Sequence, residues 1–116
     1  MQLLIVEDEY SIARDIEYQC RQVLADQIAT LKIVQTLEAA QDYLAKHHID
    51  LLLLDLNLSG ENGYDLLKYA VSGSFHTIVI SAHTDRAMEA FAYGVLDFLP
   101  KPLEKPRLEK AFERVP

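Results

Sequence analysis

Short apolar runs alternate with longer segments of mixed polarity along this chain. Five runs are expected to form strands: Leu3 to Val6, Thr30 to Gln35, Ile49 to Asp55, Thr77 to Ser81 and Val95 to Leu99. The third run, IDLLLLD, is apolar up to its last residue, which is typical of a strand buried on both faces. The second run alternates, as an edge strand would. Strands that alternate with helical segments indicate βα units and a parallel sheet.

The segments between the runs carry apolar residues at helical spacing. Helices are expected over Ser11 to Ala25, over Leu37 to His47, after Gly63, over Thr84 to Tyr93 with Ala87, Ala90 and Phe91 facing inward, and from Pro106 onward. Thr36 suits an N-cap and Gly94 a C-cap, and Gly60 and Gly63 would make their loop flexible. A helix is expected to end at Ser72, Gly73 and Ser74, which tolerate a left-handed turn. The pattern predicts an α/β fold whose parallel five-stranded sheet has helices on both faces.

Composition limits the classes of function. The 116 residues, half of them hydrophobic, suit one domain over residues 1–116. A net charge of -7 with 11 scattered Lys and Arg residues argues against direct nucleic-acid binding. Cys20 is the only cysteine, so no intramolecular disulfide is possible. Because neither a membrane-spanning stretch nor a signal peptide is present in the sequence, we expect no membrane partner and a cytoplasmic location.

Reactive side chains follow the expected strands. These residues are Glu7, Asp8, Asp55, Ser81 and Lys101. The carboxyl ends of parallel strands share one edge of the sheet, so these groups should converge there. Clustered carboxylates repel unless a cation neutralises them, and oxygen ligands suit Mg²⁺. Lys101 could pair with Asp55 at rest and later with a phosphoryl group, to which Ser81 could hydrogen-bond. Asp55 is therefore a candidate nucleophile for phosphoryl transfer.

Four segments, VEDE, LLLLDLNLSGENG, VISAHT and DFLPKP, resemble in this order and spacing the receiver domain of bacterial two-component response regulators. The resemblance covers essentially the whole chain. It implies a flavodoxin-like doubly wound (βα)5 fold with strand order 2-1-3-4-5. It also implies that Asp55 is the phosphoacceptor and that Mg²⁺ is held by Asp8, Glu7, Asp55 and the backbone carbonyl of Asn57.

The resemblance assigns roles to further residues as well. It implies that Lys101 and Ser81 bind the phosphoryl group, that Ser81 and Phe98 form the switch, that the peptide bond before Pro102 is cis, and that Asn57 and His83 tune loss of the phosphoryl group. Glu7 replaces the Asp often found first in the acidic pair, so we expect it to act on the metal through water. Phe98 replaces the more frequent Tyr and lacks its hydroxyl.

The resemblance also implies partners. A sensor histidine kinase or a phosphotransfer protein would supply the phosphoryl group, and phosphorylation would favour a homodimer or docking through the fourth helix, fifth strand and fifth helix. Apart from its own phosphorylation and slow dephosphorylation, the domain is not expected to be an enzyme. The stretch AFAYGVLDFLPKPLEKPRLEKAFERV resembles receivers that precede LytTR-type DNA-binding domains, which implies transcription regulation through an attached domain. A free-standing phosphorelay receiver, or another effector, remains the alternative.

Three other interpretations stay open. The acids Glu7, Asp8 and Glu9 could simply open the first helix, because acids favour its positive end. The chain could be a receiver-like interaction module that is never phosphorylated. It could also be an aspartyl-phosphate phosphohydrolase of the haloacid-dehalogenase type, although Asn57 stands where that family needs a second Asp as acid and base. Asp97 is expected to make only a surface or loop hydrogen bond.

Overall fold

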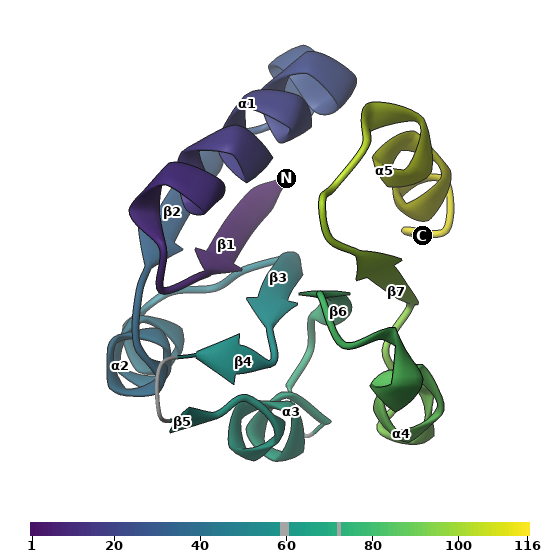
Figure 1. The fold of residues 1–116 in the computed structure, drawn as a ribbon. Coiled ribbons are helices and arrows are strands. Elements are labelled where there is room, and N and C mark those ends of the chain that lie inside the picture. The colour runs from purple at the N-terminus through teal and green to yellow at the C-terminus, as the bar shows by residue number, and fades with distance from the viewer. Residues whose placement is uncertain (59–60, 72) are drawn as a thin grey trace.

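Five parallel strands form one sheet in the computed structural model, which describes residues 1–58, 61–71 and 73–116 (Figure 1). The strands are β1 (Gln2–Val6), β2 (Thr30–Val34), β3 (Leu51–Asp55), β6 (His76–Ser81) and β7 (Asp97–Pro100). They lie in the order β2-β1-β3-β6-β7. Counted among the sheet strands alone, this is the order 2-1-3-4-5, and the predicted flavodoxin-like fold is confirmed.

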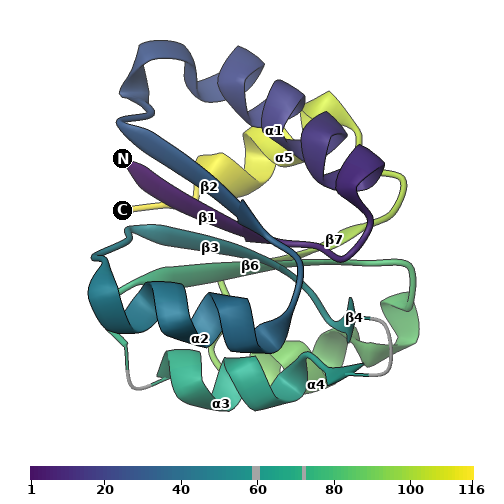
Figure 2. The same cartoon turned by 90° about the vertical axis from the view of Figure 1, so that its left-hand side faces the viewer.

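Helices cover both faces of the sheet, as Figure 2 shows. One face carries α1 (Tyr10–Leu24) and α5 (Lys105–Phe112), and the other carries α2 (Leu37–Lys46), α3 (Tyr64–Val71) and α4 (Ala87–Ala92). Two 3-10 turns, Ala25–Gln27 and Thr84–Arg86, complete the helical segments. Side chains of β3 alternate between the two cores, with Leu52 and Leu54 on the α2 side and Leu51 and Leu53 on the α1 side. This two-sided burial explains the uninterrupted apolar run.

Most helix ends follow the predicted residues. The Thr36 hydroxyl accepts a hydrogen bond from the Ala39 backbone nitrogen at 3.0 Å, which caps α2 as expected. Gly94 ends the α4 segment with a φ of 86°. Gly73 follows α3 without using the left-handed conformation that glycine tolerates. The expectations for Gly60 and Ser72 fall outside the described residues.

The fourth helix differs from its prediction. The expected helix begins with the 3-10 turn, and α4 itself spans only Ala87–Ala92. Ala90 is fully buried, whereas Phe91 is 45% exposed, so its predicted inward orientation is wrong. Ala90 faces the sheet most directly; Ala87 lies about 60° round the helix from it and Phe91 about 100° on the same side, so burial decreases in that order.

A small antiparallel hairpin follows β3 and was not predicted. It pairs β4 (Asn57–Leu58) with β5 (Glu61–Asn62). Leu58 is buried, and the backbone nitrogen of Gly63 donates to the Leu56 oxygen at 3.1 Å. Leu58 and Gly63, which lie on either side of the residues outside the description, are therefore held at the end of β3.

Replacing Gly63 with Ala should destabilise the fold. A Cβ atom at this position would lie 2.6 Å from Leu56 Cα and 2.9 Å from its oxygen, and backbone atoms cannot yield as a side chain can. We expect a loss of about 1–3 kcal/mol in the free energy of unfolding, measured by urea denaturation. Gly73→Ala is the matched control, because the three atoms nearest to its Cβ all belong to the Phe75 side chain, which can move as backbone cannot. An equal loss in both variants would contradict the prediction.

Candidate functional site

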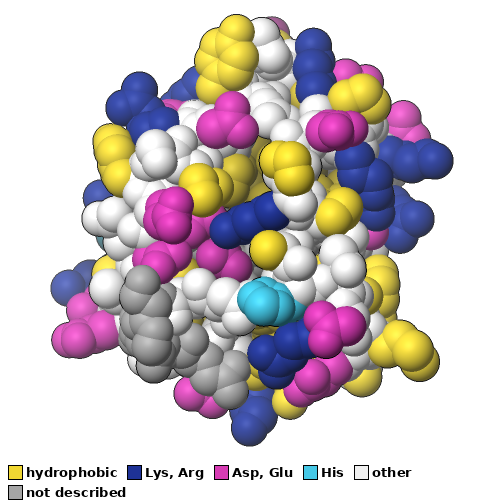
Figure 3. Space-filling view, viewed as in Figure 1, with side chains coloured by type: hydrophobic (Ala, Val, Ile, Leu, Met, Phe, Trp, Pro, Cys, Tyr) yellow, Lys and Arg dark blue, Asp and Glu magenta, His cyan; other side chains and the backbone are white. Residues whose placement is uncertain are grey.

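The carboxyl edge of the sheet brings the predicted reactive residues together. Asp55 closes β3 and is 5% exposed, and its register partner on β6 is Ile80, so Ser81 lies one residue beyond. Ser81 pairs in turn with Pro100, which places Lys101 directly after the end of β7. Near the centre of the face in Figure 3, acidic side chains adjoin a Lys or Arg side chain.

Lys101 joins two of the three predicted acids. Its Nζ lies 3.1 Å from Asp55 Oδ2, which is the resting pair that the sequence predicted. A closer contact, 2.6 Å from Nζ to Glu7 Oε1, was not predicted. Burial alone would lower the pKa of Lys101, but its hydrogen bonds and charge interactions with both carboxylates outweigh burial and raise it. The ammonium group therefore stays charged between the two acids.

Glu7, Asp8 and Asp55 form an acidic cluster. Each offers a carboxylate oxygen, and these atoms lie within 4.8 Å of one another. Burial raises the pKa of Glu7 to about 7, with Asp8 and the Asp55 charge adding to the rise and Lys101 opposing it. A bound divalent cation would favour the charged form of such a group. Three clustered carboxylates are the hard oxygen donors that Mg²⁺ prefers, so these residues fit that ion.

Asn57 connects Asp55 with Ser81. Its backbone nitrogen donates to Asp55 Oδ1 at 3.0 Å, and its side-chain Nδ2 donates to Ser81 Oγ at 3.2 Å. The His83 backbone nitrogen also donates to Ser81 Oγ, at 3.0 Å. Phe98, the predicted switch aromatic, is buried in β7, whereas the His83 side chain is exposed.

The chain after β7 holds Lys101 in place. Its backbone nitrogen donates to the backbone carbonyl oxygen of Ser81 at 3.0 Å. The Lys101–Pro102 peptide bond is cis, as the resemblance implied. On α1, Gln19 Nε2 donates to the Leu103 oxygen at 2.9 Å, which anchors this segment to the α1 side of the sheet.

Asp97, like Phe91, was placed wrongly by sequence reasoning. Instead of a surface or loop hydrogen bond, it forms a buried ion pair in which Arg107 NH1 and NH2 lie 2.8 and 2.7 Å from its carboxylate oxygens. Its Oδ1 also accepts from the Phe98 backbone nitrogen at 2.8 Å. Burial tends to raise the pKa of Asp97, but Arg107, Phe98 and the Arg114 charge together lower it. The sequence offered no local signal for a pair formed between β7 and α5.

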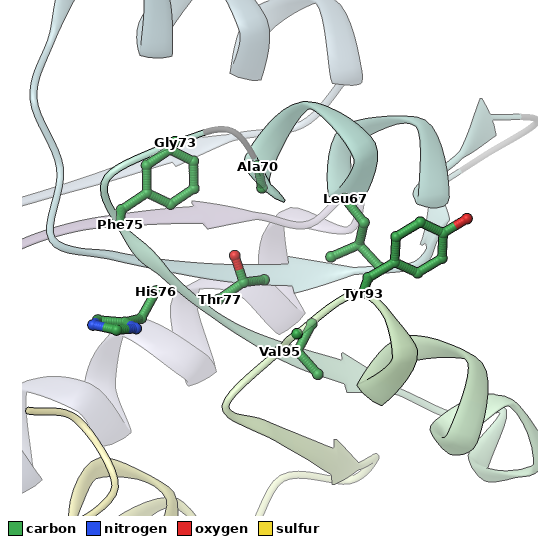
Figure 4. Close-up of a pocket in the computed structure, with 9 residues that line it drawn as sticks. Leu67, Ala70, Gly73, Phe75, His76, Thr77, Tyr93 and Val95 are labelled. Carbon is green, nitrogen blue, oxygen red and sulfur yellow. The ribbon is translucent and has the colours of Figure 1, made fainter.

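A separate cavity lies at the opposite end of β6. Figure 4 shows its lining by the C-terminal part of α3, the start of β6 and the turn that follows α4. Its volume is about 270 Å³, and His76 and Thr77 contribute polar groups. None of the predicted site residues lines it.

Among the described residues, no helix is long and apolar enough to cross a membrane.

Comparison with known proteins gives consistent matches. A family model described as "Response regulator receiver domain" matches residues 3–113. The chain is 34% identical over 113 residues to the transcriptional regulatory protein MalR of Bacillus subtilis, covering 94% of this chain and 47% of MalR. It is 32% identical over 117 residues to the sensory transduction protein LytR of Staphylococcus epidermidis, covering 99% and 46%. The chain thus spans about half the length of these curated relatives.

Solved structures agree with the fold. The response regulatory domain of mrkE from Klebsiella pneumoniae superposes with a TM-score of 0.84 at 21% identity, covering 99% of this chain and 94% of that one. The non-phosphorylated HemR receiver domain from Leptospira biflexa gives 0.81 at 25% identity, covering 98% and 92%. At 21% identity, the match to mrkE concerns the fold alone.

Proposed function

The chain belongs to the response regulator receiver domain family of two-component systems, and on this premise we propose that it is a phosphorylation-controlled signalling domain with Asp55 as phosphoacceptor. The observation that carries the proposal is the set of contacts of Asp55 itself. Its carboxylate closes a buried strand, is 5% exposed, and is oriented by the Lys101 ammonium at 3.1 Å and the Asn57 backbone nitrogen at 3.0 Å.

The proposed reaction transfers a phosphoryl group from a phosphohistidine of a sensor histidine kinase or a phosphotransfer protein. A carboxylate oxygen of Asp55 forms a bond to phosphorus while the phosphorus–nitrogen bond breaks, and the bonding pair returns to the donor imidazole. Lys101 then pairs with a phosphoryl oxygen, to which Ser81 donates a hydrogen bond. Such transfer depends mainly on positioning and charge neutralisation, which these residues can supply.

Mg²⁺ is the cofactor that the acidic cluster suits. Asp8, Glu7, Asp55 and the backbone carbonyl of Asn57 would hold it, and the ion would neutralise negative charge on the phosphoryl oxygens. Because Glu7 is already paired with Lys101 at 2.6 Å, its carboxylate also fixes the ammonium beside Asp55. We assign the switch to Ser81 and Phe98, and the tuning of the phosphorylated lifetime to Asn57 and His83.

Incubation with acetyl phosphate tests the proposal directly. We expect intact mass spectrometry to find one added phosphoryl group in the presence of Mg²⁺ and none after chelation, because like-charged reactants need a neutralising cation. No adduct at any promptly quenched time point would contradict phosphorylation and favour the interaction module that is never phosphorylated. Continuous release of inorganic phosphate at high turnover would instead favour the phosphohydrolase.

The α4 face is the proposed output surface. Met88 is 86% exposed and Phe91 is 45% exposed, so α4 presents apolar side chains to solvent next to β7 and α5. We propose that phosphorylation promotes a homodimer through α4, β7 and α5. Sedimentation should show a larger species after addition of beryllofluoride and Mg²⁺, and a Phe91→Ser variant should remain monomeric. Equal sedimentation of the wild type with and without beryllofluoride would contradict a dimer.

The regulated process is proposed from the relatives and from the resemblance of the C-terminal stretch to receivers that precede LytTR-type domains. MalR is named a transcriptional regulatory protein, and it is about twice as long as this chain. We therefore propose that the receiver acts in the cytoplasm and controls transcription through an attached DNA-binding domain of LytTR type. Sequencing the gene beyond the codon for Pro116 would distinguish this output from a free-standing phosphorelay receiver.

A further inference from the structure

The hydroxyl of Ser81 is fully engaged as an acceptor. It lies on a fully buried side chain, and its oxygen receives Asn57 Nδ2 at 3.2 Å and the His83 backbone nitrogen at 3.0 Å. A hydroxyl oxygen has two lone pairs, so these two donors use its whole acceptor capacity and fix the position of Oγ. Only the Asn57 contact depends on a side chain of the donor residue.

Asn57 is held firmly enough to act on Ser81. Asn57 is the first residue of β4 and pairs with Asn62 in the hairpin. Its backbone nitrogen donates to Asp55 Oδ1 at 3.0 Å. Asn57 therefore contacts the phosphoacceptor through its backbone and the switch hydroxyl through its side chain. Removing the side chain leaves the backbone contact to Asp55 available, so the two contacts can be tested separately.

We propose that Asn57 is a positioning residue whose side-chain amide holds Ser81 in its unphosphorylated orientation. This inference rests on the proposed function. A phosphoryl group on Asp55 is an acceptor that draws Ser81 toward itself, and it must compete with the Asn57 amide for the position of that hydroxyl. In this proposal the contact is present in the resting state and is lost when Ser81 moves, so it opposes the switch by the free energy of one hydrogen bond between neutral groups.

Deletion of the amide should therefore favour the switched state. With Mg²⁺ held constant, beryllofluoride is titrated into the whole chain and followed by amide NMR signals. Asn57→Ala is expected to bind beryllofluoride about 2- to 10-fold more tightly than the wild type, which is the range for one such hydrogen bond. Mg²⁺ affinity is also measured in both proteins without beryllofluoride, so that any change in metal binding is separated from the effect on Ser81.

A double-mutant cycle separates this role from a general structural one. In a Ser81→Ala background the hydroxyl is gone, so adding Asn57→Ala should leave beryllofluoride affinity unchanged. Tightening of the same size in that background would overturn the inference, as would equal affinities of the wild type and Asn57→Ala. Asn57→Ser, whose side chain is too short for the contact, serves as a second variant should the Ala variant fail to fold.

The result also separates this inference from the proposed function. A wild type that binds beryllofluoride with Mg²⁺ but is unaffected by Asn57→Ala overturns only the role of Asn57. A wild type that neither binds beryllofluoride nor accepts a phosphoryl group from acetyl phosphate overturns both.

Discussion

Asp55→Asn is expected to abolish phosphorylation completely, even with Mg²⁺ and an excess of acetyl phosphate. The variant keeps the shape of the side chain but replaces the nucleophilic carboxylate with a neutral amide that cannot form the acyl phosphate. It also removes the charge that Lys101 contacts at 3.1 Å. Intact mass after prompt quenching is the measurement, with the wild type treated in parallel.

Asp42→Asn is the matched control for this loss. Asp42 is an exposed residue of α2, distant in sequence from every proposed site residue, so its conversion should leave the phosphorylated fraction unchanged. A phosphoryl group that persists on Asp55→Asn would show that another residue is the acceptor, and peptide mapping would then identify it. Loss in both variants would indicate damage that is not specific to the site.

The part of the site that was predictable follows from topology. Asp55 and Lys101 each come directly after an apolar run, and parallel strands deliver such residues to one edge whatever the details of packing. The predicted pair between them is present for this reason. The fold was predictable on the same basis, because buried strands and amphipathic helices leave strong periodic patterns.

The remaining features depend on side-chain reach and on packing between distant segments. Glu7 contacts Lys101 across 94 positions of sequence, and only the packed structure shows that its longer side chain takes the closer place beside the ammonium. The outward position of Phe91 depends on which residue of α4 faces the sheet most directly, and the periodicity did not fix that rotation. The hairpin after β3 has strands of two residues, too short for any alternating pattern.

Asp97 was misplaced because its neighbours resemble an ordinary edge. Within VLDFL, a single polar residue among apolar ones is typical of a strand position that faces solvent. Its partner Arg107 lies on α5, and no short-range rule connects the two. The structure instead buries Asp97 to 1% exposure and gives its carboxylate two short contacts with Arg107.

Among these substitutions, Asp97→Asn is expected to cause the largest loss in the free energy of unfolding. Breaking a buried ion pair costs about 3–5 kcal/mol, and because the Arg107 side chain is 34% exposed we expect roughly 2–3 kcal/mol at neutral pH. Urea denaturation should show a midpoint lower by about 1–2 M. Arg114→Gln is the control, since Arg114 lies 3.7 Å from Asp97 and is 52% exposed, so its loss should be within about 1 kcal/mol.

The pH dependence identifies the charge as the cause. The pKa of Asp97 is lowered below its usual 3.8, so its contribution to stability is complete above that value and is lost as the pH falls through the lower folded-state pKa. The stability gap between the wild type and Asp97→Asn should therefore be constant from pH 7 to about pH 5 and should narrow below about pH 4. A gap that persists unchanged at acidic pH would mean that the hydrogen bonds of the carboxyl group, and not its charge, provide the stability.

Loss of the Asp97–Arg107 ion pair should also affect the switch, because of where the pair lies. Asp97 Oδ1 accepts from the backbone nitrogen of Phe98 at 2.8 Å while Arg107 holds the same carboxylate from α5. The pair thus connects β7 to α5. Strand β7 carries Phe98 and leads to Lys101, and α5 belongs to the proposed output face. Asp97→Asn should therefore loosen β7 against α5, which faster amide hydrogen exchange at Phe98 and Leu99 would show. Arg114→Gln should leave exchange at both amides unchanged, and equal exchange in all three proteins would contradict a tie through Asp97.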